Sequence, residues 1–192
     1  MKGSKLPYLL LLAALLLFNA LIFTVPFLAS QGQETGILYS AFAPTCHQLT
    51  SRSLCLFRSA EGYSIEDCFA SSSLSPSHQD TVVYSDKIGY KLPVCSRDTA
   101  IYLSMLLGLL ALPFVRKIET EDWPNKWVLL AAAVPIAIDG TTQLVGLRES
   151  DNLLRLITGA IIGVVLPFYL LPMLNSLYSF ILEKARKGKK KR

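Results

Sequence analysis

The sequence lacks several common signatures: it has no Cys-x-x-Cys pair, only two histidines and no tandem repeat. Without Cys-x-x-Cys, the usual redox and zinc-binding motifs are not supported. Without a repeat, a transporter built from inverted halves is not supported either. The first hydrophobic run also has no clean small-x-small cleavage site and is longer than a signal-peptide core. We therefore expect this run to stay in the membrane, with cleavage as a signal peptide as the alternative.

Charged residues are nearly missing from four long stretches of the chain. Hydrophobic residues make up 52% of the sequence and the mean hydropathy is +0.41. These residues are concentrated in runs instead of being spread at helix or strand periods. Each run is close to the roughly 20 residues that an α-helix needs to cross a bilayer. The runs cover residues 6–29, 99–115, 127–145 and 153–174.

The runs predict an all-α integral membrane protein with about four transmembrane helices. The polar stretch between the first two helices is expected to lie outside the cytoplasm, to contain disulfides, and to form short helices, turns or a hairpin. Pro167 and Pro172 are expected to kink the last helix. The predicted division is a transmembrane helix at 1–30, an extracytoplasmic cysteine-containing segment at 31–97, a three-helix membrane region at 98–185 and a basic cytoplasmic tail at 186–192.

Basic residues flank the hydrophobic runs at three places. With an even number of membrane spans, all three places lie on the same side of the membrane. These places are Lys2 with Lys5, then Arg116, Lys117 and Lys126, and finally the basic tail. The positive-inside rule predicts a multi-pass protein of the cell membrane with both termini in the cytoplasm. We expect the tail to contact anionic lipid headgroups. Since no aromatic residue interrupts it, we do not expect nucleic-acid binding, despite a net charge of +5.

The polar stretch contains all four cysteines of the chain, which are Cys46, Cys55, Cys68 and Cys95. An even number of cysteines outside the cytoplasm usually forms disulfides, and the sequence alone does not choose among the three pairings. A metal site is the alternative. Cys46 adjoins His47, and Cys95 stands three residues before Asp98 at the start of a predicted helix. Zinc or iron would suit such ligands, although the spacing alone favours disulfides.

Asp139 is the most informative residue of the runs, because it lies deep within the third one. An ionised carboxylate facing lipid would cost at least about 2.5–3.5 kcal/mol, so Asp139 must face protein or water. Gln143 lies on the same helical face. In an antiparallel helix pair Arg155 would lie at similar depth, and we expect a direct or water-bridged contact between Arg155 and Asp139. The other expected members of the cluster are Arg97, Asp98, Tyr102, Arg148 and Asn152.

Three motifs follow one another along the chain. They are Cys46-His47-Gln48 with Arg52-Ser53, then Pro93-Val94-Cys95-Ser96-Arg97, and finally Asp139-Gly140-Thr141-Thr142-Gln143 continuing through Arg148 and Asn152 to Arg155. With these motifs the chain resembles a family of small bacterial and archaeal predicted membrane proteins that is known as a domain of unknown function. The resemblance covers about residues 46–163 and implies a prokaryotic type of membrane protein, but no particular reaction.

The resemblance also implies roles for the cysteines. The family pattern does not call for Cys55 and Cys68, which implies that these two form a disulfide within an inserted loop. Cys46 and Cys95 then belong together, as a second disulfide or as metal ligands. The family has a second cysteine where this chain has Asp98. This departure removes a redox pair there and leaves Cys46, His47, Cys95 and Asp98 as the implied metal ligands.

The polar cluster leaves the function open between two main hypotheses. It could be a binding site or a structural clamp between helices, facing outward and holding a small anionic or zwitterionic headgroup. It could instead belong to a small membrane enzyme, with or without a metal, that acts on a lipid or a thiol at the outer leaflet. A transporter is the weakest hypothesis, because four helices would have to form a homo-oligomer to enclose a path.

Overall fold

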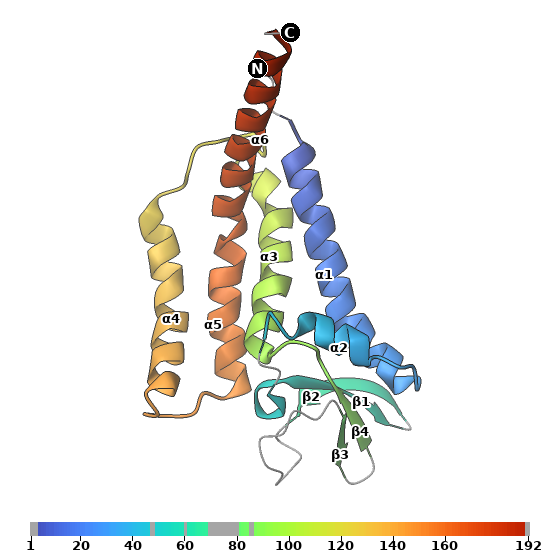
Figure 1. The fold of residues 1–192 in the computed structure, drawn as a ribbon. Coiled ribbons are helices and arrows are strands. Elements are labelled where there is room, and N and C mark those ends of the chain that lie inside the picture. Colours follow the sequence, from blue (N-terminus) through green and yellow to red (C-terminus); the bar gives the residue numbers. More distant parts are fainter. Residues whose placement is uncertain (1–3, 47–48, 60, 69–80, 85–86, 191–192) are drawn as a thin grey trace.

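The computed structural model describes residues 4–46, 49–59, 61–68, 81–84 and 87–190. Upright helices form a bundle, and a small sheet lies across one end of it (Figure 1). In the described residues, four helical segments are long and apolar enough to cross a membrane. Three are single helices, and the fourth consists of two helices placed end to end. They are α1 (Leu6–Ser30), α3 (Ser96–Val115), α4 (Lys126–Leu144), and α5 (Asn152–Val165) followed by α6 (Pro167–Lys190).

Each of these segments overlaps one of the charge-poor runs. The break in the last one lies at Pro167, where the sequence predicts a kink. Proline has no N–H to donate to the carbonyl four residues earlier, so the helix stops and restarts at this point. The last bond of α5 runs from Leu166 N to Ile162 O at 3.1 Å, and the first turn of α6 already uses Leu166 O as an acceptor for Tyr169 N.

The stretch between α1 and α3 contains a four-stranded antiparallel sheet, which the all-α prediction missed. Its strands are β1 (Leu54–Ser59), β2 (Gly62–Asp67), β3 (Thr81–Tyr84) and β4 (Lys87–Lys91), in the order β2-β1-β4-β3. A short helix, α2 (Gly36–Phe42), and a 3₁₀ turn, Thr50–Arg52, precede the sheet. Strands of four to six residues are too short to show a clear period in the sequence, and the sheet was therefore missed.

The sheet has its own small core. Cys55 and Phe57 point inward from alternate positions of β1, and they pack with Cys68 and Val82. Cys55 and Cys68 form a disulfide, which is the pairing that the family resemblance implies. The ring of Phe57 lies over its cross-strand partner Gly89, where a Cβ would come within 2.6 Å of the ring. Only glycine leaves room for this aromatic side chain between β1 and β4.

Polar contacts fasten the sheet to the end of α1 and to α2. Arg58 donates to the carbonyl of Ser30 at 2.8 Å, and the hydroxyl of Tyr39 donates to the carbonyl of Lys91 at 2.5 Å. Gln31 donates to the hydroxyl of Tyr63 at 2.8 Å. These bonds satisfy backbone carbonyls where the helix and the strand end, and they fix the sheet across the bundle.

Helices α3 and α5 pack with their backbones in contact, because glycines face the neighbouring helix. A Cβ at Gly163 would lie 2.0 Å from Ser104 Oγ, and one at Gly108 would lie 2.3 Å from the carbonyl oxygen of Val164. At Gly159 the nearest atom is the carbonyl oxygen of Arg97, at 2.6 Å. Such close approach through small residues four apart is how membrane helices commonly associate. It holds the first turns of α3 and α5 close together at the sheet end.

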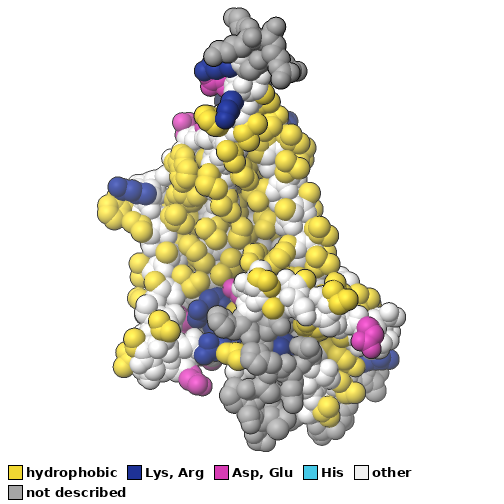
Figure 2. All heavy atoms as spheres, viewed as in Figure 1, with side chains coloured by type: hydrophobic (Ala, Val, Ile, Leu, Met, Phe, Trp, Pro, Cys, Tyr) yellow, Lys and Arg dark blue, Asp and Glu magenta, His cyan; other side chains and the backbone are white. Residues whose placement is uncertain are grey.

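Helix α4 is less embedded than the others and stands beside α5 (Figure 1). Its only buried residues are Ala132 and Asp139. A polar contact lies near each of its ends: the carbonyl of Asn125 accepts from Tyr169 Oη at 2.7 Å, and Asp139 is paired near the sheet. Between its ends most of its surface is apolar, as is most of the helical surface in Figure 2.

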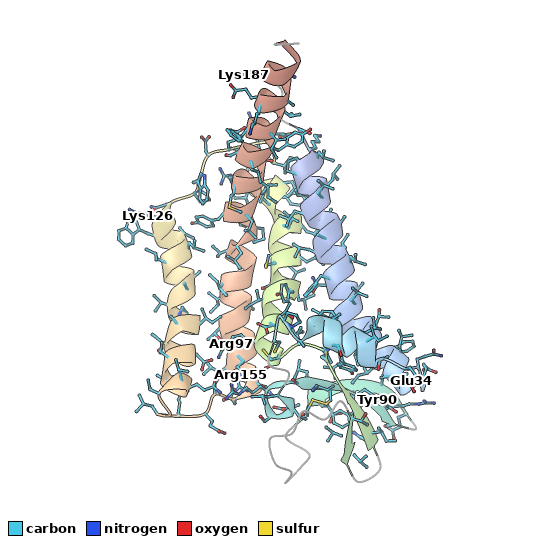
Figure 3. The ribbon with its side chains drawn as sticks, in the orientation of Figure 1. Glu34, Tyr90, Arg97, Lys126, Arg155 and Lys187 are labelled. Atoms are coloured by element: carbon cyan, nitrogen blue, oxygen red, sulfur yellow. A yellow bond between two sulfur atoms is a disulfide. The ribbon has the colours of Figure 1, made fainter. Side chains whose placement is uncertain are left out.

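Both chain ends lie at the end of the bundle opposite the sheet (Figure 1). The connection between α3 and α4 is at the same end, together with Lys126 and Lys187, whereas Arg97 and Arg155 lie at the sheet end (Figure 3). The basic residues between α3 and α4 and the described part of the basic tail therefore share one end of the bundle, as the charge pattern predicts. Which side of a membrane this end faces stays a prediction.

Candidate functional site

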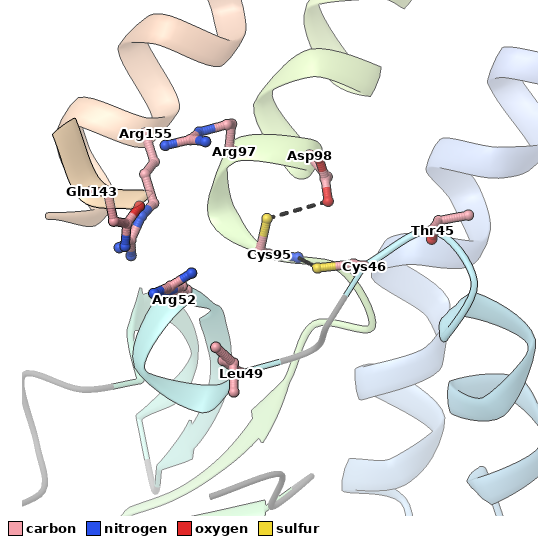
Figure 4. A pocket seen from close by; sticks show the side chains of 9 residues that line it. All are labelled: Thr45, Cys46, Leu49, Arg52, Cys95, Arg97, Asp98, Gln143 and Arg155. Atoms are coloured by element: carbon pink, nitrogen blue, oxygen red, sulfur yellow. Dashed lines mark hydrogen bonds between the residues drawn. The ribbon is translucent and has the colours of Figure 1, made fainter. Parts of the chain in front are cut away.

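A polar cavity of about 210 Å³ opens at the sheet end, where α3 begins and α4 ends (Figure 4). One wall is formed by arginines and an amide, and the other by two cysteines and a carboxylate. The lining residues are Thr45, Cys46, Leu49, Arg52, Cys95, Arg97, Asp98, Gln143 and Arg155. They come from the loop after α2, the 3₁₀ turn, the start of α3, the end of α4 and the start of α5. The fold thus brings residues more than 100 positions apart in sequence into one cavity.

Asp139 forms an ion-pair clamp behind the arginine wall. Its carboxylate is 2% exposed, and it accepts from Arg97 of α3 through Oδ2 and from Arg148 Nη2 through Oδ1, the latter at 2.8 Å. Arg97 is 21% exposed and Arg148 is 49% exposed. One buried carboxylate therefore ties α4 to α3 and to the loop before α5.

The direct ion pair expected between Asp139 and Arg155 is not found in the described part of the chain, whereas the water-bridged form of this contact stays a prediction. The expectation treated α4 and α5 as an isolated antiparallel pair. In the folded bundle α3 packs against α5 through its glycines and places Arg97 nearer to Asp139. Arg148 folds back from the loop to occupy the other carboxylate oxygen. Arg155 turns to neutral partners instead.

Two guanidinium groups of the arginine wall converge on one neutral oxygen. With the Gln143 amide oriented so that its oxygen faces the donors, it accepts from Arg155 Nη2 at 2.8 Å and from Arg52 Nη2 at 3.0 Å. Arg155 is only 4% exposed. In the described residues, no carboxylate forms an ion pair with Arg52 or Arg155. The hydrogen-bond partners that the structure shows for the Arg52 and Arg155 side chains are neutral, and Asp139 acts on Arg155 without a direct ion pair, so both guanidinium groups keep their positive charge at the cavity.

Asn152, at the start of α5, connects this wall to the sheet and to α3. Its Nδ2 donates to Asp67 at 2.7 Å, and its Oδ1 accepts from Ser96 at 2.8 Å and from Arg155 at 2.9 Å. Asn152 and Ser96 are buried. Sequence reasoning included Asn152 but missed Ser96 and Asp67, which carry no recognisable signal. Arg52 was also missed as a site residue, although it stands in the first motif.

The opposite wall joins Cys46, Cys95 and Asp98. The backbone N–H of Cys95 donates to Cys46 Sγ at 3.2 Å, and Cys95 Sγ donates to Asp98 Oδ2 at 3.2 Å (Figure 4). One ligand atom from each of the three side chains lies within 4.8 Å of the other two. Neither cysteine forms a disulfide in this structure. The contact with Cys46, burial and the nearby Asp98 all raise the pKa of the Cys95 thiol above its ordinary value.

One predicted site residue, His47, lies outside the described residues. Tyr102 does not line the cavity: its ring packs on Phe18 with 4.4 Å between centroids, in the contact between α1 and α3. All the other predicted members either line the cavity or support its walls.

Comparisons with known proteins relate the chain to a family of predicted membrane proteins and to uncharacterized proteins of archaea. Residues 86–169 match the family model described as predicted membrane protein (DUF2085). An uncharacterized protein of Methanocaldococcus jannaschii is 35% identical over 173 residues, which cover 86% of this chain and 91% of that relative. An uncharacterized protein of Methanothermobacter thermautotrophicus is 42% identical over 78 residues, which cover 40% of this chain and 67% of that relative. No solved structure matches the chain.

Proposed function

Since the chain belongs to the DUF2085 family of predicted membrane proteins, we propose that it works within the bilayer as a binding protein, holding a small anionic group in its arginine-lined cavity. The family relation and the apolar helices make it a multi-pass membrane protein. The motifs that carry the family resemblance supply most of the cavity lining. Binding at this cavity is the function that its geometry supports best.

The observation that carries the proposal is the charge of the arginine wall. Arg52 and Arg155 both point at the oxygen of Gln143, and no carboxylate of the described residues forms an ion pair with either. Arg155 is almost fully buried. Burying a charge without a counter-charge costs several kcal/mol. An anion in the cavity would recover part of that cost, and it would find two guanidinium groups already positioned.

The chemistry of the wall favours a phosphate-bearing group. Guanidinium groups present paired N–H donors that match the oxygens of phosphate and carboxylate. The cavity, at about 210 Å³, suits a small group of this kind. It lies where α3 begins and α4 ends, at one end of the membrane-spanning helices, and we place this end at the depth of lipid headgroups. Either a lipid headgroup or a free phosphate would supply this chemistry.

The proposed orientation places the cavity on the outer side of the cell membrane. The opposite end of the bundle has Arg116 and Lys117 between α3 and α4, Lys126 at the start of α4, and the basic tail from the end of α6. Short basic connections favour the cytoplasm. On this side the tail would contact anionic headgroups of the inner leaflet.

A binding experiment tests the proposal directly. Purified protein in phosphatidylcholine nanodiscs is titrated with inorganic phosphate at constant ionic strength, and its thermal stability is followed. We expect a saturable rise in the unfolding temperature for the natural protein. Arg52→Gln should weaken the apparent affinity at least about tenfold, because one charged donor is worth about 1.5–3 kcal/mol. Arg116→Gln, at the other end of the bundle, is the matched control and should bind as the natural protein does.

The outcome also separates the two sources of the anion. If nanodiscs containing phosphatidylglycerol stabilise the natural protein but not Arg52→Gln, and free phosphate does nothing, the ligand is a lipid headgroup. If only free phosphate acts, it is a soluble anion. The proposal is refuted if neither stabilises the natural protein, or if Arg52→Gln and Arg116→Gln behave alike.

The alternative function, a small membrane enzyme acting on a lipid or a thiol, rests on a different observation. Two thiols and a carboxylate share the cavity with the arginines. They are the groups in the cavity best suited to supply a reactive centre, whereas the arginines alone can bind and orient. The binding proposal does not depend on them.

A further inference from the structure

The cysteine wall brings together three metal-binding side chains from separate parts of the chain. Cys46 follows α2, whereas Cys95 caps the start of α3, and Asp98 lies in its first turn. The spacing of three residues puts Cys95 and Asp98 on the same face of the helix. Cys46 is held next to them by the N–H of Cys95 at 3.2 Å. All three side chains are partly buried and line the cavity.

The distances fit a tetrahedral ion. With zinc–sulfur bonds of about 2.3 Å and zinc–oxygen bonds of about 2.0 Å, two ligand atoms of a tetrahedron lie about 3.5–3.8 Å apart. In this structure Cys95 Sγ and Asp98 Oδ2 are 3.2 Å apart, and no two of the three ligand atoms are more than 4.8 Å apart. Small side-chain rotations would complete the geometry, with no movement of the helices.

We infer that Cys46, Cys95 and Asp98 are ligands of one zinc ion, and that its fourth position faces the arginine wall. Thiolates select soft or borderline metals and are poor ligands for calcium and magnesium. Two thiolates, a carboxylate and Zn²⁺ leave one net negative charge. Arg52 and Arg155, across the cavity, supply compensating positive charge. Three protein ligands with a fourth position left to water or a ligand are typical of zinc sites that do chemistry.

The zinc ligands Cys46, Cys95 and Asp98 are not used by the anion proposal, and the two proposals share only the charge of Arg52 and Arg155 across the cavity. Zinc binding can therefore fail while phosphate binding succeeds, and the reverse can also occur. The two rival states of the same side chains are a disulfide between Cys46 and Cys95, and a pair of thiols hydrogen-bonded to Asp98 without any metal. Each rival predicts a different count of reactive thiols.

The test measures zinc directly. The full chain is purified in detergent through a tag that binds no metal, and zinc is quantified per chain by mass spectrometry. After removal of the metal, the affinity for Zn²⁺ is measured by competition with a chromophoric chelator, and Co²⁺ is added as a spectroscopic probe. We expect one zinc per chain and, with Co²⁺, the intense near-ultraviolet band of thiolate coordination.

Variants assign the ligands. Cys46→Ser and Cys95→Ser should each lower the zinc affinity at least about 100-fold, which exceeds the roughly 10–100-fold loss from changing an outer partner. Asp98→Asn should lower it at least about tenfold. The double variant Cys55→Ser/Cys68→Ser is the matched control: it removes the disulfide cysteines and should keep one zinc.

The thiol count decides between the remaining outcomes. Metal-free protein with two reactive thiols and no measurable affinity for Zn²⁺ would overturn the inference in favour of a thiol pair. If the metal-free protein shows no reactive thiol until it is reduced, Cys46 and Cys95 form a second disulfide and the inference is overturned. Zinc retained equally by Cys46→Ser and Cys95→Ser would show binding elsewhere on the protein. Because the Co²⁺ spectrum is recorded on the natural chain, the inference can fail even if a variant does not fold.

Discussion

Replacing Asp139 by leucine is expected to lower the free energy of unfolding by about 3 kcal/mol. Asp139 is 2% exposed and is paired with Arg97 and Arg148. Removing one partner of a buried ion pair costs about 3–5 kcal/mol, because the other charge stays buried without compensation. Arg97 is 21% exposed, so the lower end of this range applies. Arg148 is 49% exposed and can turn to water, so its share is within about 0.5 kcal/mol.

A second replacement tests whether the buried pair of Arg97 and Asp139 is the cause of this loss. In Arg97→Leu/Asp139→Leu no buried charge is left unpaired, and apolar groups of similar size often replace a buried ion pair at little cost. We therefore expect the double variant to be more stable than Asp139→Leu alone. Asp122→Leu, at the opposite end of the bundle, is the control and should change the stability by no more than about 0.5 kcal/mol.

The measurement is equilibrium unfolding in mixed detergent micelles with a rising fraction of dodecyl sulfate. Trp123 and Trp127 flank the start of α4 and report its environment by fluorescence. A loss of about 3 kcal/mol corresponds to a change of roughly a hundredfold in the unfolding equilibrium constant. If Asp139→Leu loses less than about 1 kcal/mol, or if the two replacements simply add, the clamp does not hold the bundle as argued.

Three further predictions follow from the fold. Gly163→Ala should cost about 1–3 kcal/mol in the same unfolding assay, because its Cβ would lie 2.0 Å from Ser104 Oγ; Gly36→Ala meets nothing within 4 Å and should be neutral. Cys55→Ser/Cys68→Ser should cost about 3 kcal/mol in the unfolding of the sheet, measured by hydrogen exchange, and reduction should bring the natural protein to the same value. A fluorescent protein fused to the C-terminus should fold and emit light, whereas a reporter active only outside the cytoplasm should stay inactive there; the reverse result would contradict the proposed orientation.

The membrane helices could be predicted from the sequence because charge-poor runs of this length have few other structures available. The family relation was also predicted correctly from the three motifs. The sheet was not predicted, since the burial pattern of β1 involves only two inward residues, Cys55 and Phe57. The close packing of α3 and α5 had a visible signal in Gly159 and Gly163, which stand four residues apart, but their partner helix could not be read from the sequence.

The sequence named most of the residues of the candidate site, but it did not predict which of them contact one another. Sequence spacing brought Asp139 and Gln143 to one face of a helix, and this part required only local geometry. The choice of Arg97 over Arg155 as the partner of Asp139 depends on how a third helix is placed, and a single sequence does not contain that information. The meeting of Cys46 with Cys95, 49 positions apart in sequence, likewise depends on the fold of the segment between them.

The two fastenings of α4 have a mechanical consequence. Lipid tails are as apolar as the neighbouring helices, so burial of its apolar surface gives α4 little preference for one position. Its place is set by Asn125 near one end and by Asp139 near the other. The helical stretch that joins them, residues 126–139, is about 21 Å long. Because this stretch is a single helix, a displacement of Asp139 and Gln143 beside the cavity also moves the start of α4. The basic connection at the far end of the bundle moves with it.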